Sequence, residues 1–290
     1  MSLEIFQVEI TSRCNMRCSF CPHSEMTRDK KDMSLSEFSL VAKNFRRGQR
    51  VGLHVMGEPL LNISFEYIVK ETIMEGALPE IATNSLALSS PERRRDILLS
   101  GLQLMILDIS RYKEEQEVMQ KAIYNAEATV GLACELFAKG YFVPQILLQI
   151  VLKKGVRQCF SADMVNKAFL YPEVLKLHSK FLDSWAGHRK DLAEKSFVSP
   201  PEKRTPCAEP WNRVVVLQDG SVVPCCRDAF GQIVYGNIFK TSLQDIEENS
   251  PVLRDLRDKM MNQEWDLLPE PCRSCREWHI PMDRRVGDDE

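Results

Sequence analysis

The chain has 290 residues, 44% of them hydrophobic and 27% charged, so it is long enough for one large domain with a smaller one and too apolar to be disordered. Its net charge of −3 excludes the strongly basic surface with which many proteins bind nucleic acid. No run of about eighteen apolar residues predicts a membrane span, and the first residues lack the pattern of a secretory signal peptide. We therefore expect a cytoplasmic protein that binds neither nucleic acid nor a membrane.

Strand-like and helix-like stretches alternate from residue 3 to about residue 195. The predicted strands are residues 3–10, 50–55, 79–83, 102–109, 142–153 and 173–178. Alternation of this kind favours parallel strands joined by crossover helices, in the α/β class. About six such units fit the length, whereas the eight of a full TIM barrel need a longer chain.

Boundary residues mark the helices between these strands. Ser34 and Glu37 have the spacing of a capping box. Ser90-Pro91 places an N-cap before a proline in the first helical turn. A helix over 63–75 is expected to stop at glycine 76, and a helical stretch over 113–139, in one piece or two, at glycine 140.

The ten cysteines form two groups, one near each end of the chain, with Cys134 and Cys159 standing apart. A cytoplasmic compartment keeps thiols reduced, so metal binding explains such groups better than disulfides do. Two metal centres are therefore predicted. The first group is Cys14, Cys18 and Cys21, and the second contains Cys207, Cys225, Cys226, Cys272 and Cys275.

The first group follows the first predicted strand with the spacing C-x3-C-x2-C. Three thiolates on one short loop are soft ligands, suited to an iron–sulfur cluster or to zinc. A cubane cluster has four irons, so three cysteines leave one iron without a protein ligand. That iron can bind a small molecule, as the open position of a catalytic zinc does. A zinc site with three thiolate ligands is the alternative.

This motif resembles the C-x3-C-x-φ-C loop of the radical SAM superfamily, with Phe20 at the aromatic position φ. The resemblance implies an open, partial (β/α)6 TIM-like barrel and a [4Fe–4S] cluster whose open iron binds S-adenosylmethionine (SAM). It also implies reductive cleavage of SAM to a 5′-deoxyadenosyl radical that abstracts hydrogen from a substrate. An electron donor such as flavodoxin or ferredoxin is then the expected protein partner.

A second element matches the family at the end of the second predicted strand, where active-site residues of parallel barrels lie. Gly57-Glu58-Pro59 resembles the family's G-G-E-P element, with Met56 in place of the first glycine. The resemblance implies that Gly57 and Glu58 hold the amino group of SAM. An ordinary Gly-Pro turn before a helix is the alternative.

Three polar residues near the ends of later strands are further candidates for cofactor binding. Asn84 resembles the asparagine of the family's T-N-G element, although an asparagine turn explains it equally well. Ser110 follows the fourth strand, where the family places a serine near the ribose, and Gln149 lies in the fifth. Residues 178–187, after the sixth strand, are expected to line one wall of the active site.

The composition changes after residue 195, and the proline-rich residues 196–206 are predicted to link a barrel of residues 1–195 to a module of residues 207–290. Asp219-Gly220 between two β-rich runs predicts a hairpin with a type I′ turn. Ser250-Pro251 caps a predicted helix with one apolar face, formed by Val252, Leu253, Leu256 and Met260.

Four cysteines of this module, Cys207, Cys225, Cys272 and Cys275, are enough to saturate one [4Fe–4S] cluster. Their arrangement resembles the SPASM/twitch extension of radical SAM enzymes. No cysteine follows Cys275, which favours one auxiliary cluster rather than two. A zinc knuckle with four thiolate ligands is the alternative.

The remaining cysteines have other predicted roles. Cys226 and Cys159 are candidates for donating a hydrogen atom to a substrate radical, and Cys226 is also an alternative ligand. An unpaired cysteine is more often structural, as we expect for Cys134.

We expect an oxidoreductase-type radical SAM enzyme that acts on a small polar substrate, namely a sugar, an aminocyclitol or a nucleoside-like alcohol. Dehydrogenation, epimerisation and sulfur insertion are the reactions considered, and the auxiliary cluster is expected to relay an electron. A maturase that crosslinks or epimerises a ribosomal peptide is the second hypothesis; the early position of Cys14 leaves no room for a preceding leader-binding domain and counts against it. A non-enzymatic metal-binding protein is the third, and Gly57-Glu58-Pro59 counts against it.

Overall fold

The computed structural model describes residues 5–110, 116–155, 159–187, 189–193 and 199–280. Its centre is a parallel sheet of six strands in the order β6-β5-β4-β3-β2-β1. These strands are β1 (Ile5–Val8), β2 (Arg50–Gly52), β3 (Leu78–Thr83), β4 (Leu104–Asp108), β5 (Gln145–Leu152) and β6 (Leu175–Phe181). All six predicted strands are therefore confirmed.

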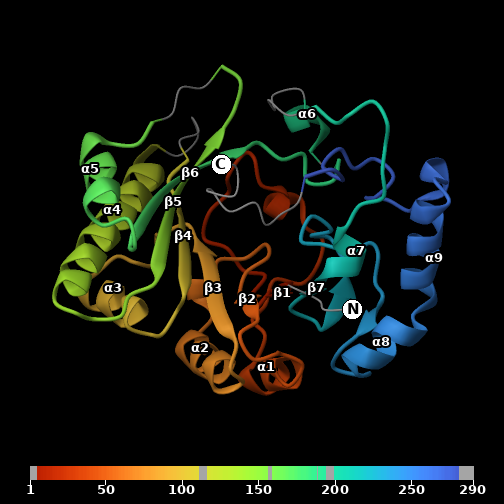
Figure 1. Ribbon diagram of the computed structural model, residues 1–290, viewed down its shortest axis with the longest axis horizontal. Helices are drawn as coiled ribbons and strands as arrows, with labels where there is room; N and C mark the ends of the chain where they lie inside the picture. The colour runs from red at the N-terminus through yellow and green to blue at the C-terminus, as the bar shows by residue number, and fades with distance from the viewer. Residues whose placement is uncertain (1–4, 111–115, 156–158, 188, 194–198, 281–290) are drawn as a thin grey trace.

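Five helices connect these strands and lie along the outer side of the curved sheet (Figure 1). They are α1 (Leu35–Ala42), α2 (Phe65–Met74), α3 (Pro91–Leu98), α4 (Gln116–Ala138) and α5 (Ala162–Leu170). Strands that alternate with helices on one side of a curved parallel sheet make an open (β/α)6 barrel, as predicted. In the described residues, no helix is both long enough and apolar enough to cross a membrane.

The two faces of the sheet differ in how tightly they are packed. Met105 and Leu107 of β4 and Ile146 and Leu148 of β5 are fully buried in the core beneath the helices. The alternate positions of these strands point into the barrel and are only half-buried. Because the side chains of a strand alternate, this pattern indicates a filled outer layer and an accessible lumen.

The register places polar side chains in one row on the lumen face. Asp108 of β4 is paired with Gln149 of β5, which is paired with His178 of β6. The Gln149 amide donates a hydrogen bond of 3.1 Å to the Asp108 carboxylate. The row lies near the carboxyl ends of the strands, where barrel enzymes bind their substrates.

The predicted helix boundaries are confirmed in detail. The Ser34 hydroxyl accepts from the Glu37 amide while the Glu37 carboxylate accepts from the Ser34 amide, which completes the capping box. The Ser90 hydroxyl accepts from the Arg93 amide and so caps α3, which has a proline in its first turn. The helix predicted over 63–75 is α2, and Gly76 follows it with a φ of 78°.

Several details differ from the prediction. β2 ends at Gly52, three residues before the predicted end, although the Leu53 amide still donates to the Glu80 carbonyl of β3. β6 continues three residues past His178. The helix predicted over 113–139 is unbroken from Gln116 to Ala138, and residues 111–115 lie outside the described part. Val252 is 40% exposed and so does not share the buried face of its helix.

The C-terminal module continues the barrel sheet instead of forming a separate one. It contributes β7 (Arg213–Val216), β8 (Ser221–Val223) and β9 (Gly236–Asn237). β7 pairs in parallel with β1, so the module is attached along the edge of the first barrel strand. Of the predicted linker and its surroundings, residues 194–198 lie outside the description and residues 199–206 contain no helix or strand.

β7 and β8 form the predicted antiparallel hairpin, but the turn type is wrong. Gly220 has a φ of 83°, whereas Asp219 is not among the residues with positive φ that a type I′ turn requires at both positions. The Gly220 amide donates to the Leu217 carbonyl over 2.9 Å, which closes a four-residue turn followed by a left-handed glycine. The longer loop removes the need for positive φ at Asp219.

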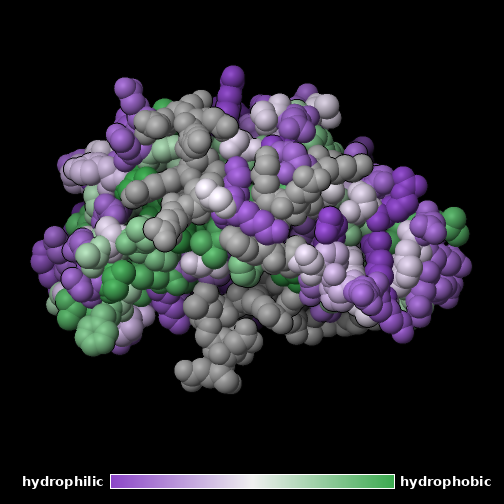
Figure 2. All heavy atoms as spheres, turned by 90° about the horizontal axis from the view of Figure 1, so that it is seen from above, coloured by the Kyte–Doolittle hydropathy of each residue, from purple (hydrophilic) through white to green (hydrophobic). Residues whose placement is uncertain are grey.

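The helices of the module contribute buried side chains to the same core as the hairpin strands. They are α7 (Glu209–Asn212), α8 (Leu243–Asn249) and α9 (Pro251–Met261), preceded by the short α6 (Lys190–Ala193). Leu253, Leu256 and Met260 of α9 are buried, and Ser250 caps the helix as predicted. Figure 2 shows hydrophilic surface at the end of the molecule that carries α8 and α9, and more hydrophobic surface at the end that carries α4 and α5.

Candidate active site: two groups of cysteines at the carboxyl end of the barrel

Cys14, Cys18 and Cys21 lie on the loop after β1, as the sequence predicts, and all three are half-buried. Burial, together with the charge of a neighbouring thiolate of the same group, raises the pKa of Cys18 to about 12 and that of Cys21 to about 11. Thiols so close together in a dry site stay protonated unless a cation stabilises their thiolates. The donor set therefore fits an iron–sulfur cluster.

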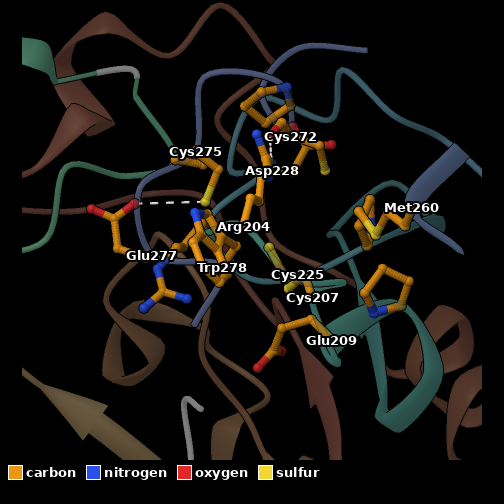
Figure 3. Close-up of a pocket in the computed structure, with 15 residues that line it drawn as sticks. Arg204, Cys207, Glu209, Cys225, Asp228, Met260, Cys272, Cys275, Glu277 and Trp278 are labelled. Carbon is orange, nitrogen blue, oxygen red and sulfur yellow. Dashed lines mark hydrogen bonds between the residues drawn. The ribbon is translucent and has the colours of Figure 1, made fainter. Parts of the chain in front are cut away.

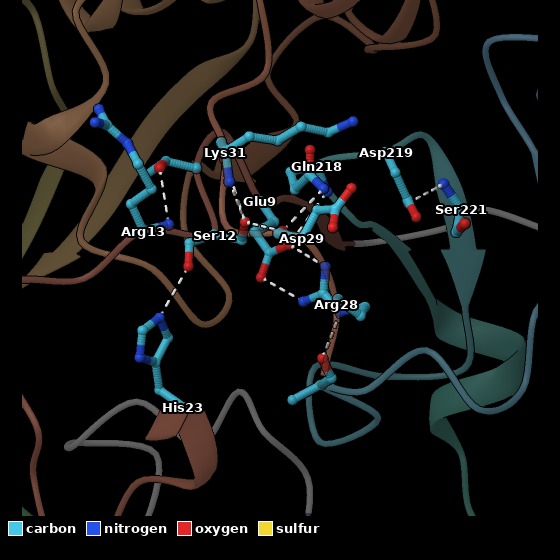
Figure 4. Close-up of polar contacts among 12 residues, drawn as sticks. Glu9, Ser12, Arg13, His23, Arg28, Asp29, Lys31, Gln218, Asp219 and Ser221 are labelled. Atoms are coloured by element: carbon cyan, nitrogen blue, oxygen red, sulfur yellow. Dashed lines mark hydrogen bonds and ion pairs between the residues drawn. The ribbon is translucent and has the colours of Figure 1, made fainter. Parts of the chain in front are cut away.

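Charged and polar contacts fix this loop to the rest of the protein (Figure 4). Arg28 donates two hydrogen bonds of 2.9 Å to the Glu9 carboxylate, whose side chain is fully buried, and a third of 2.9 Å to the carbonyl of Ala229 in the C-terminal module. The ring of His23, after the last cysteine, contacts the Ser12 carbonyl at 2.8 Å. Buried charges that are fully paired hold a loop in one geometry.

Gly57 is where the second motif meets the cysteine loop. A Cβ at this position would lie 2.1 Å from the carbonyl oxygen of Thr11 and 2.8 Å from that of Arg13. The next amide, of Glu58, donates a hydrogen bond of 2.8 Å to the same Arg13 carbonyl. Only glycine allows this approach of two backbones, so the motif does more than make a turn.

Glu58 is 2% exposed and caps the short 3-10 helix Pro59–Leu61 that the buried Pro59 opens. Its carboxylate accepts from the Thr83 hydroxyl at 2.7 Å, the Asn84 amide at 2.8 Å and the Leu60 amide at 3.2 Å. Burial raises the pKa of Glu58 to about 7, although these three hydrogen bonds lower it. A carboxylate has about four acceptor positions, so one is left for a ligand.

Asn84 connects Glu58 to the cysteine loop, because its backbone amide donates to the Glu58 carboxylate and its side chain contacts the loop. Its side-chain amide donates to the Asn15 oxygen at 2.8 Å and lies 3.8 Å from the Cys14 sulfur. Its side-chain oxygen accepts from the Leu86 amide, so it also forms the asparagine turn that was the alternative explanation. The two interpretations are compatible.

The other predicted cofactor-binding residues lie at the same end of the barrel. The buried Ser110 hydroxyl accepts a 2.8 Å hydrogen bond from the Val151 amide, which joins the ends of β4 and β5. The backbone carbonyl of Phe20 accepts from the indole nitrogen of Trp185 at 2.8 Å. Contacts of Phe20, Gly57, Glu58, Pro59, Asn84, Ser110 and Gln149 with SAM stay predictions.

Four of the five cysteines of the second group surround one cavity (Figure 3). Cys207 comes from the start of the module, Cys225 from the loop after β8, and Cys272 and Cys275 from the segment after the 3-10 helix Trp265–Leu267. Burial raises the pKa of all four thiols, that of Cys275 to about 12. Four sulfurs from three segments around one cavity fit a cluster with four thiolate ligands. Their roles as ligands, like those of the first group, stay predictions.

In the part of the chain that is described, no group of three His, Cys, Asp or Glu side chains is arranged to hold a single metal ion. Cys226 is buried beside Cys225 but does not line the cavity of the other four. Cys159 is exposed in the loop between β5 and α5, and Cys134 is buried in α4 as expected. Hydrogen donation by Cys159 or Cys226 stays a prediction.

The segment Asp183–Gly187, which we call the bridge segment, contacts residues that lie close in the chain to each of the two groups of cysteines. Trp185 donates to the Phe20 carbonyl in the first cysteine loop, while the Ser184 amide donates at 2.8 Å to Glu277, two residues after Cys275. Trp185 and Ala186 have φ angles of 55° and 53°, which are strained for residues with a side chain. The sequence marked this stretch as an active-site wall but gave no sign of these contacts.

Replacing Trp185 by phenylalanine should disturb the first cluster while leaving the fold intact. The variant keeps an aromatic ring but leaves the Phe20 carbonyl without its indole donor, which costs about 1 kcal/mol. We expect about a fivefold slower formation of 5′-deoxyadenosine and an altered EPR signal of the SAM-bound cluster. Trp265→Phe is the control, since that ring contacts Arg204 instead. Equal rates in the two variants would contradict the positioning role.

An open parallel barrel with three thiols after its first strand and four thiols around a cavity in the following module defines a class of iron–sulfur enzymes. The chain belongs to the radical SAM superfamily: the model of that superfamily matches residues 8–151, and the model of an iron–sulfur cluster-binding domain, SPASM, matches residues 207–276. Both resemblances inferred from the cysteine spacing are confirmed.

The chain is similar to a peptide-modifying enzyme and to solved structures of two kinds. It is 22% identical to the PqqA peptide cyclase of Gluconobacter oxydans (strain 621H) over 93% of this chain and 83% of that protein. BtrN in complex with AdoMet and 2-DOIA superposes with a TM-score of 0.60 at 20% identity, over 95% of this chain and 94% of BtrN. SuiB of Streptococcus suis bound to precursor peptide SuiA superposes with a TM-score of 0.60 at 11% identity, over 88% of this chain and 67% of SuiB. The likeness to the two structures shows a shared fold.

The protein is thus a radical SAM enzyme with a SPASM domain. Its cofactors are a [4Fe–4S] cluster, SAM and an auxiliary iron–sulfur cluster, as the sequence predicts. Enzymes of this superfamily act on small-molecule or peptide substrates and require a reductant.

Proposed function

We propose that this enzyme removes a hydrogen atom from a small polar molecule, such as a sugar, an aminocyclitol or a nucleoside-like alcohol, and oxidises it by two electrons overall. Cys14, Cys18 and Cys21 hold the SAM-binding cluster, and Cys207, Cys225, Cys272 and Cys275 hold the auxiliary cluster. When bound, the first cluster and SAM supply the radical chemistry. The observation that carries the proposal is the pair of cysteine groups, joined by the bridge segment at the open end of one barrel.

The lumen supports a polar substrate. Asp108, Gln149 and His178 form a polar row, and Lys180 lies two residues further along β6 on the same face. The Nδ1 atom of His178 is buried without a hydrogen-bond partner among the described residues. Such groups can bind hydroxyl or amino substituents, and a buried donor or acceptor left unpaired favours a ligand that pairs it. The likeness to BtrN, solved with the small molecule 2-DOIA, agrees with this choice.

A peptide substrate is the second candidate. The relatives include a peptide cyclase and a structure with a bound precursor peptide, so the same fold accommodates peptides. Both candidates are tested by incubating the reduced enzyme with deuterated alcohols of each small-molecule class and, separately, with deuterated peptides. Deuterium in 5′-deoxyadenosine identifies the substrate. Label from peptides alone would overturn the small-molecule proposal.

SAM binding is expected to depend on pH through Glu58. The carboxylate must be ionised to hold the amino group of SAM, and burial raises its pKa to about 7 in the free protein. The ionised fraction is then about 0.1 at pH 6 and about 0.9 at pH 8, so the apparent Kd for SAM should fall about tenfold between them. Glu58→Gln should bind more weakly and lose this dependence. The same pH profile in both proteins would rule out the contact.

A further inference from the structure

Arg227 places a buried positive charge at the proposed auxiliary cluster. It follows Cys225 and Cys226 in the chain and lines the same cavity as the four cysteines of the second group. Its side chain is only 5% exposed. A cation in a dry site acts over several ångströms with little screening, so it favours electron gain by any cluster that the cavity holds.

The counter-charge of Arg227 comes from a different part of the chain. Its Nε atom donates to the Asp183 carboxylate over 2.7 Å, and the Asp183 side chain is 9% exposed. The guanidinium holds the pKa of Asp183 below its ordinary value although burial opposes this. Removing one partner of such a buried pair leaves the other charge uncompensated.

The other charged side chains around the cavity have partners of their own. Glu209 is paired with Arg213, and Arg204 donates to the Cys272 carbonyl at 2.6 Å. Glu277 accepts from the Ser184 amide and, at 3.7 Å, from the Cys275 thiol. Asp228 accepts from the amides of two residues of its own loop. Within the described cavity lining, Arg227 is thus the cation whose carboxylate partner lies outside the module.

Asp183 belongs to the bridge segment, so the ion pair is connected to the first cysteine loop. Its Oδ1 atom accepts from the Trp185 amide at 2.6 Å, and the indole of Trp185 donates to the Phe20 carbonyl. This chain of contacts holds the strained left-handed residues Trp185 and Ala186 in place. The carboxylate is therefore rigidly positioned beside the guanidinium.

We propose that the Arg227–Asp183 ion pair sets the reduction potential of the auxiliary cluster, with Arg227 stabilising the reduced form and Asp183 limiting that effect. The inference rests on the proposed ligand role of the four cysteines. Net charge and hydrogen bonds around a cluster are among the factors that fix its potential. The two residues are positioning residues for electron transfer, and neither has to touch the substrate.

The test is a redox titration of the reconstituted full-length protein, in which EPR spectroscopy measures the reduced clusters at each potential. The same titration on a Cys14→Ala, Cys18→Ala, Cys21→Ala protein identifies the auxiliary signal. Arg227→Met should shift the auxiliary midpoint to lower potential, because the reduced cluster loses its cation. Asp183→Asn should shift it to higher potential, because the guanidinium is no longer compensated. Arg227→Lys should stay near the native midpoint.

The matched controls make the same two changes in charge at exposed positions on the surface of the protein. Arg254→Met and Asp255→Asn alter exposed positions of α9 and should leave the midpoint unchanged. Unchanged midpoints in Arg227→Met and Asp183→Asn, or shifts in the same direction, overturn the inference. If the Arg227→Met protein loses its auxiliary iron, the midpoints of the other two variants test the inference. Asp183→Asn should still shift to higher potential, and Arg227→Lys should still stay near the native midpoint. A native protein with only one titrating cluster would instead overturn the proposed auxiliary site, and the inference with it.

Discussion

A protein with Cys14, Cys18 and Cys21 all replaced by alanine is expected to keep about half of its iron and to form no 5′-deoxyadenosine. Two cubane clusters give about eight irons per chain, and the auxiliary group of cysteines retains about four of them. The half-buried first loop carries the three thiols that are proposed to hold the SAM-binding cluster. Iron analysis and chromatography of the reaction measure the two effects together.

The matched variant removes the other group. Replacing Cys207, Cys225, Cys272 and Cys275 should also leave about four irons but should retain SAM cleavage, because the first cluster is intact. Formation of the oxidised product should then fail. Zinc in place of iron around the cavity of the second group would contradict the electron relay, and SAM cleavage that survives loss of the first group would contradict the assignment.

Gly57→Ala is expected to lower the rate of SAM cleavage by about a hundredfold, because a displacement of about 1 Å at a reacting site has an effect of this size. The new Cβ would meet the Thr11 carbonyl oxygen at 2.1 Å, and both contacting atoms belong to backbone, so one chain must move. We also expect a loss of about 1–3 kcal/mol in unfolding free energy. The rate of SAM cleavage and the denaturant unfolding curve, both measured on the anaerobic protein, test these two expectations.

Gly131→Ala is the control for this substitution. Gly131 lies within α4, and a Cβ there would meet no heavy atom within 4 Å. It should leave the rate unchanged and stabilise the protein by up to about 1 kcal/mol through helix propensity. A Gly57→Ala protein as active as Gly131→Ala would show that the close backbone approach has no role in catalysis.

Much of the fold follows from local patterns. The alternation of strand-like and helix-like stretches predicts all six barrel strands, and capping residues such as Ser34 and Ser90 predict where helices begin. The parallel pairing of β7 with β1 has no such signal, since it joins residues about two hundred positions apart through tertiary packing. The turn type failed at Asp219 for a related reason, because the loop length depends on the register of β7 and β8.

The residues of the site also fall into those that local sequence patterns predict and those that tertiary packing determines. Cysteine spacing and Gly57-Glu58-Pro59 identify the two cofactor regions because ligands close in sequence leave a motif. The contacts of Trp185, Asp183 and Arg227 are set by where the loop after β6 meets the module, and a single charged or aromatic residue in a loop carries no periodic signal. Arg227 could have been suspected only from its position beside two cysteines.

The most direct test of the central claim is anaerobic turnover of the reconstituted protein with SAM and dithionite. An iron left open by Cys14, Cys18 and Cys21 predicts methionine and 5′-deoxyadenosine in equal amounts. A protein that carries about eight irons yet leaves SAM intact under this reductant would contradict the account.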